Sequence, residues 1–161
     1  MTAAFLVVLL LAVQVTAPPG LPTLLLPQGN GAWVVRIETS GGFTGRGLGN
    51  YTASSSGELK CLTYAQPAGC PEHLDGDTPQ VLGRLVGTIP RTSDAPPVEL
   101  SAPGRSMCND CVTTTMSVRR RDADGEQTVT YRWDESTIAA VPGEVLRLRA
   151  AIMALASARA R

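Results

Sequence analysis

Polar and apolar residues alternate along several short stretches of the chain, which is the pattern of β-strands that bury one face. In the first such stretch Trp33, Val35 and Ile37 alternate with Val34, Arg36 and Glu38. Two further strand-like stretches follow at 51–53 and 58–64, with a Ser- and Gly-containing turn between them. This pattern predicts three consecutive antiparallel strands.

A second pair of strands is predicted nearer the C-terminus. Residues 122–125 read Asp-Ala-Asp-Gly, which favours a tight turn between two strands. Apolar or threonine side chains recur at every second position on both sides of this turn, at Val112, Thr114, Met116, Val118, Val129, Tyr131 and Trp133. We expect a regular β-hairpin here.

Two stretches have the spacing of an amphipathic helix. The first is expected to begin at Thr78, with its hydroxyl as the cap and Pro79 in the first turn, and to end at Pro90. Its apolar stripe consists of Val81, Leu82, Leu85, Val86 and Ile89. The second is expected to begin at Pro142, and its stripe consists of Val145, Leu148, Ile152 and Leu155.

The predicted order of elements is strand-strand-strand-helix-strand-strand-helix, which indicates an α+β fold. We expect one antiparallel sheet of about five strands with both helices packed on one face. The predicted domain spans residues 32–158 and follows a Pro/Gly-rich linker at 18–31. Residues 90–107 contain several prolines and are expected to form a long irregular connection.

The N-terminal residues have features of an export signal. Residues 3–13 are apolar and uncharged, but the stretch is shorter than the ~20 residues of a membrane-spanning helix. Small residues follow at 15–17. We therefore expect residues 1–17 to be a signal peptide or an N-terminal anchor, and the protein to be secreted or periplasmic.

The four cysteines suit an exported protein, because an even number in an oxidising compartment favours disulfides. Three pairings are possible, and the sequence alone does not choose between them. Closeness along the chain favours Cys61 with Cys70 and Cys108 with Cys111.

The charges give little indication of a nucleic-acid or membrane partner. Fourteen basic residues balance fourteen acidic ones, so no net field attracts nucleic acid or an anionic membrane surface. We expect a protein partner, no nucleic acid, and membrane contact only through an uncleaved N-terminal segment.

Catalytic patterns are missing from the sequence. The one histidine, His73, lies among acidic loop residues at 72–77, which is more typical of a solvated turn than of a metal site. Cys108 and Cys111 have the spacing of a redox pair, but a strand rather than a helix is predicted to follow them. No Gly-x-Ser-x-Gly or phosphate-binding glycine motif is present. We expect neither enzymatic activity nor a bound cofactor or metal.

Five glycines lie within residues 40–49, which read Ser-Gly-Gly-Phe-Thr-Gly-Arg-Gly-Leu-Gly. This density indicates a backbone that needs positive φ angles or close approach, as in a bulged connection between two strands. The Ser-Gly-Gly-Phe-Thr-Gly stretch, the strand before it, the later hairpin and the helix after Pro142 resemble the emfourin family over about residues 33–157.

Emfourins are small bacterial proteins, and the founding member inhibits thermolysin-type metalloproteases. The resemblance implies an inhibitor that presents residues 40–49 to a protease cleft, with Phe43 as the apolar anchor; Phe43 folding back into the core is the alternative. The predicted contact residues are Gly41, Gly42, Phe43, Thr44, Gly45 and Arg46.

The export segment and the four cysteines are not part of the emfourin pattern. A binding module with a different partner, or a redox or metal protein built on Cys108 and Cys111, are the other hypotheses.

Overall fold

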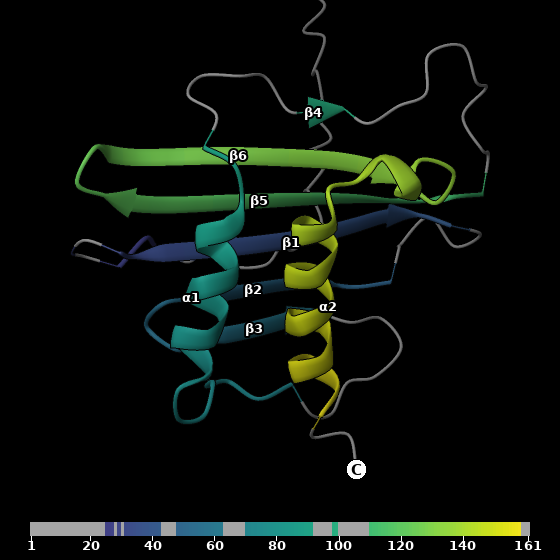
Figure 1. The fold of residues 1–161 in the computed structure, drawn as a ribbon. Helices are drawn as coiled ribbons and strands as arrows, with labels where there is room; N and C mark the ends of the chain where they lie inside the picture. Colours follow the sequence, from purple (N-terminus) through teal and green to yellow (C-terminus); the bar gives the residue numbers. More distant parts are fainter. Residues whose placement is uncertain are drawn as a thin grey trace, which may run out of the picture.

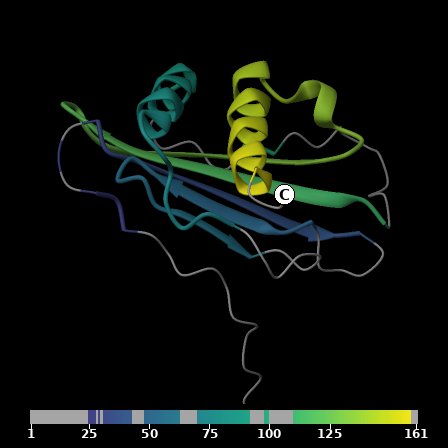
Figure 2. The same ribbon diagram turned by 90° about the horizontal axis from the view of Figure 1, so that it is seen from below.

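A computed structural model describes residues 25–27, 29, 31–42, 48–62, 70–91, 98–99 and 110–158. Within these residues, one β-sheet carries two α-helices, and both helices lie on the same side of it (Figures 1 and 2). The predicted α+β class, the single sheet and the placement of the helices on one face are confirmed.

The strands of the sheet are β1 (Trp33–Gly41), β2 (Asn50–Ser54), β3 (Leu59–Leu62), β4 (Val98–Glu99), β5 (Val112–Asp122) and β6 (Gly125–Asp134). Their order across the sheet is β3-β2-β1-β5-β6-β4. All neighbours are antiparallel except β4, which pairs with β6 in parallel. The short strand β4 lies inside the connection that the sequence predicted to be irregular.

A row of large side chains crosses the helix-covered face of the sheet. Ile37 on β1 pairs with Tyr51 on β2 and with Met116 on β5, and Met116 in turn pairs with Tyr131 on β6. Residues paired in this way point to the same face, and all four are at most 7% exposed. Burial of each such side chain contributes about 1.5–3 kcal/mol, so this row is the centre of the core.

The helix α1 (Thr78–Thr88) buries Leu82 and Val86 against the sheet, and Ile89 is buried directly after its end. The expectation that Thr78 caps this helix is wrong. Thr78 is its first helical residue, and the preceding Asp77 makes no side-chain hydrogen bond as the cap. Val81 is 43% exposed, because it lies at the edge of the apolar stripe and not at its centre.

The helix α2 (Gly143–Ser157) buries Val145, Leu148 and Ile152 completely, which confirms the centre of its predicted stripe. A short 3-10 helix, η1 (Ile138–Ala140), precedes it and was not predicted. Among the described residues, no helix has the length and apolar character needed to cross a membrane.

The opposite face of the sheet is mostly polar and carries a small apolar cluster at one end. Leu26, Ala32 and Val34 form this cluster. The segment before β1 is also fastened to β5, because Arg121 donates a side-chain hydrogen bond to the carbonyl oxygen of Pro27. Part of the predicted linker therefore packs on the sheet.

Candidate functional site

Several strand ends meet at one end of the sheet. In the antiparallel register, Gly41 at the end of β1 faces Val112 at the start of β5, and Thr113 faces Asp134 at the end of β6. The connection from β1 to β2 leaves the sheet here (Figure 1). We call this region the loop end and define it by Thr39, Gly41, Gly42, Leu48, Gly49 and Cys111.

The side chain of Thr39 closes the base of the β1–β2 connection. Its Oγ1 accepts hydrogen bonds from the backbone N–H of Leu48 at 2.8 Å and of Gly49 at 2.9 Å, and donates one to the Gly49 carbonyl oxygen at 2.6 Å. These three bonds use the full hydrogen-bonding capacity of a hydroxyl. Thr39 is 6% exposed, so water competes little for these bonds.

Two glycines allow the connection to leave β1 beside Cys111. Gly41 and Gly42 have φ angles of 86° and 72°, a region that L-residues with a side chain rarely adopt. A Cβ atom on Gly41 would lie 2.5 Å from the carbonyl oxygen of Cys111, and the Gly42 N–H donates to that oxygen at 3.2 Å. The predicted need for positive φ and close approach is confirmed at these two positions.

Leu48 is the exposed apolar side chain that the structure describes in this connection. It is 54% exposed, although its backbone N–H is held by Thr39. The sequence analysis did not select Leu48, because a leucine between two glycines could equally point into the core. Of the predicted contact residues, Gly41 and Gly42 lie at the loop end, whereas Phe43, Thr44, Gly45 and Arg46 lie outside the described residues.

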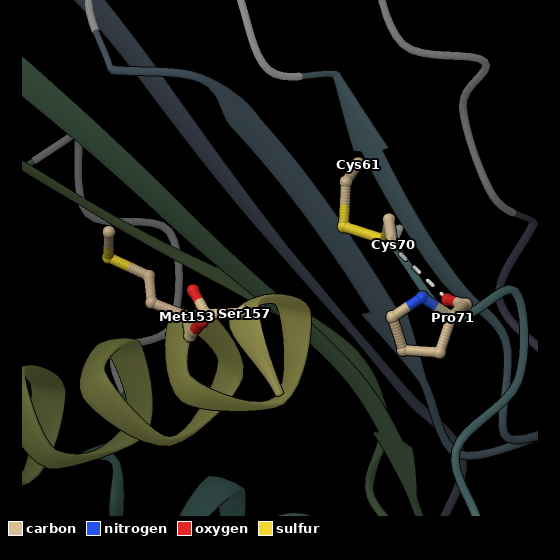
Figure 3. Close-up of a disulfide and its surroundings, with 5 residues drawn as sticks. All are labelled: Cys61, Cys70, Pro71, Met153 and Ser157. Atoms are coloured by element: carbon tan, nitrogen blue, oxygen red, sulfur yellow. Dashed lines mark hydrogen bonds between the residues drawn. A yellow bond between two sulfur atoms is a disulfide. The ribbon is translucent and has the colours of Figure 1, made fainter. Parts of the chain in front are cut away.

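A disulfide between Cys61 and Cys70 ties the end of β3 to the segment that leads into α1 (Figure 3). This confirms the predicted pairing. The two Cα atoms are 5.9 Å apart, and the bridge closes a sequence separation of nine residues. Cys111 is also disulfide-bonded, while Cys108, its predicted partner, lies outside the described residues.

The turn after β6 is ordered by Asp134. Its Oδ1 accepts hydrogen bonds from the Ser136 hydroxyl at 2.6 Å, the Ser136 N–H at 2.8 Å and the Thr137 N–H at 3.0 Å. These bonds, with the Ser136 hydroxyl as the largest contribution, lower the pKa of Asp134 because they favour the ionised carboxylate. A second connection at this end of the sheet is therefore fixed by side-chain hydrogen bonds.

Metal-ligating side chains do not gather in the described part of the chain. Within it, no three His, Cys, Asp or Glu side chains come together as metal ligands would. His73 is exposed and lies in an isolated bridge opposite Glu58, at the edge of the sheet. The loop end combines a fixed backbone with an exposed leucine, an arrangement suited to binding a protein surface.

Comparison with protein-family models, with curated proteins and with solved structures finds no match to this chain.

Proposed function

We propose that this protein is an exported, non-catalytic inhibitor that occupies the cleft of a thermolysin-type metalloprotease with its loop end. One observation carries the proposal. Leu48 exposes 54% of its surface, yet its backbone N–H lies 2.8 Å from the hydroxyl oxygen of the buried Thr39. An apolar side chain is thus presented to solvent from a backbone that is already fixed.

Such preorganisation favours tight binding. Ordering a loop or a side chain on association costs about 0.5–1.5 kcal/mol for each immobilised side chain, and a fixed loop avoids part of that cost. The Thr39 hydrogen bonds and the bond from the Gly42 N–H to the Cys111 carbonyl oxygen hold the two ends of the connection before any partner arrives. An exposed leucine on a fixed stretch of backbone suits an apolar specificity pocket in an enzyme cleft.

The choice of a thermolysin-type protease comes from the emfourin resemblance. The Ser-Gly-Gly-Phe-Thr-Gly stretch that carries the resemblance runs directly from β1 into the connection that ends at Leu48. The sequence motif and the fixed backbone therefore belong to the same segment.

The proposed compartment is extracytoplasmic. The Cys61–Cys70 disulfide indicates an oxidising environment. Together with the apolar segment at residues 3–13, it supports export to the periplasm or to the medium.

An inhibition assay tests the proposal. Increasing amounts of the purified protein are added to thermolysin, and hydrolysis of a fluorogenic peptide is followed. We expect hydrolysis to fall to zero near one equivalent, and a Phe43→Ala variant to lose inhibition without a change in melting temperature. A large fall in melting temperature would instead place Phe43 in the core. No inhibition of thermolysin-type enzymes by the unaltered protein would reject the proposal in favour of a different binding partner.

A further inference from the structure

A second candidate site lies at the other end of the sheet from the loop end. Trp33 begins β1, and its indole lines a hollow of about 390 Å³ between the first turns of α1 and the turn that joins β2 to β3. This volume falls in the usual range for sites that hold small organic ligands. The hollow is also lined by Ser55, Pro79, Gln80 and Arg84, and Gly83 forms part of its wall.

The indole nitrogen of Trp33 has no hydrogen-bond acceptor among the residues that the structure describes. Trp33 is only 4% exposed, and the N–H of a buried tryptophan usually finds a partner. Trp33 Nε1 is not one of the fully buried side-chain atoms that lack a partner, so this nitrogen still reaches solvent and its N–H is available to a ligand in the hollow.

Gly83 keeps the nitrogen side of the indole clear of side chains. A Cβ atom at this position would lie 3.0 Å from Trp33 Nε1, closer than most real contacts of that kind. Glycine within a helix costs about 1 kcal/mol relative to alanine. Helix α1 therefore has a destabilising glycine at a position where a side chain would press on the indole N–H of Trp33.

The other polar groups around the hollow also supply donors. Arg84 contributes a guanidinium and Gln80 an amide. The Ser55 Oγ accepts the backbone N–H of Trp33 at 3.1 Å, which leaves its own proton to donate. Among the described residues that line the hollow, none is an aspartate or a glutamate. The Trp33 ring and the Pro79 ring supply apolar walls.

We propose that this hollow binds a carboxylate carried on a small, flat apolar body. In this site Trp33 Nε1 donates to one carboxylate oxygen, Arg84 provides the opposite charge, and the body of the ligand lies against Trp33 and Pro79. Two sources offer this chemistry: a free aromatic acid, and the C-terminal residue of a peptide chain.

The two tryptophans make a direct test possible, because their indole N–H resonances can be followed separately by NMR in the ¹⁵N-labelled protein. The probes are benzoate and N-acetyl-phenylalanine, with benzamide and N-acetyl-phenylalanine amide as the uncharged controls. We expect the Trp33 resonance to shift with saturation for the acids and to respond weakly to the amides, while the Trp133 resonance stays in place. The acid that binds more tightly identifies the source.

Two variants assign the binding to the hollow. Gly83→Ala is expected to abolish the saturable shift, and Arg84→Gln to weaken binding about three- to fivefold, as for loss of an exposed charge contact. Because Arg84 is exposed, its replacement leaves the fold intact, and Arg147→Gln on the exposed side of α2 is the matched control. Any of four results would overturn the proposal. These are a linear shift without saturation, an equal response to the amides, a shift of both tryptophan resonances together, and unchanged binding in Arg84→Gln.

Discussion

The guanidinium Nη1 of Arg120 lies 2.8 Å from the carbonyl oxygen of Ile89, the residue that follows α1 as its C-cap. The same nitrogen donates to the Val86 carbonyl oxygen at 3.2 Å. The last carbonyl groups of a helix lack i+4 partners, and here a side chain from β5 donates to two carbonyl oxygens at the end of α1, of which that of Val86 also accepts the Ile89 N–H. Burial lowers the pKa of Arg120, because desolvation disfavours the charged guanidinium.

Replacing Arg120 with methionine is therefore expected to destabilise the protein by about 2–3 kcal/mol, because the Ile89 carbonyl oxygen loses its donor in a buried position. Urea unfolding followed by circular dichroism measures the change. Arg119→Met is the matched control, since Arg119 lies on the opposite face of the same strand and is paired with the exposed Glu126. We expect that control to lose about 1 kcal/mol or less. Equal losses in the two variants would show that the bond to Ile89 contributes nothing specific.

Thr39 and Thr114 are partners in the register of β1 and β5, and both are buried, which allows a second matched comparison. Thr39→Val removes the hydroxyl that binds the backbone of Leu48 and Gly49. No side-chain hydrogen bond joins Thr114 to another described residue. We expect Thr39→Val to cost about 1–3 kcal/mol of stability and at least about tenfold in inhibition, and Thr114→Val to change neither. Intact inhibition in Thr39→Val would remove the reason for calling the loop end preorganised.

The Cys61–Cys70 disulfide should be a stabilising cross-link. Replacing both cysteines with alanine removes a bridge across a sequence separation of nine residues, for which loop-closure entropy gives an expected loss of about 2–3 kcal/mol. The melting temperature of the double variant should therefore fall under oxidising conditions. The opposite result, an unchanged melting temperature, would mean that contacts around β3 hold the segment without the bridge.

Two tyrosines couple stability to alkaline pH. Burial raises the pKa of Tyr51 and of Tyr131 above their ordinary value of 10.0, because desolvation disfavours the phenolate. In the unfolded chain these groups ionise near pH 10, so above that pH the unfolded state binds fewer protons than the folded state and the free energy of unfolding falls. Absorbance at 295 nm measures the ionisation. We expect the ionisation of Tyr51 and Tyr131 to be delayed beyond pH 10 and to coincide with unfolding; ionisation of both near pH 10 in the folded protein would refute this.

The sequence predicted the elements with strong patterns. Alternation at Val112–Val118 and Val129–Trp133 located the hairpin, because a one-residue shift would have exposed every apolar side chain. Helical spacing similarly identified Leu148 and Ile152 as core residues. The start of α1 at Thr78 was predicted correctly, but Thr78 was wrongly given the role of the cap, since a threonine before proline suits both a cap and a first turn.

The site was less predictable, because its residues are brought together by pairing between distant strands. The glycines at 41 and 42 signalled an unusual backbone, but the oxygen that Gly41 approaches belongs to Cys111, seventy positions away. Nothing local showed that Thr39 would bind Leu48, or that Leu48 would face solvent. The hollow beside Trp33 depends in the same way on the approach of Gly83 from α1.

The most direct test of the proposed function compares two exposed apolar residues in the thermolysin assay. Leu48→Ser alters the loop end, whereas Val81→Ser alters an exposed position on α1, which is 43% exposed in the unaltered protein. Melting temperatures of both variants confirm that they are folded. We expect Leu48→Ser to weaken inhibition at least about tenfold, as for a central apolar contact in an interface, and Val81→Ser to inhibit like the unaltered protein. Full inhibition by Leu48→Ser would contradict the proposal that the loop end fills the protease cleft.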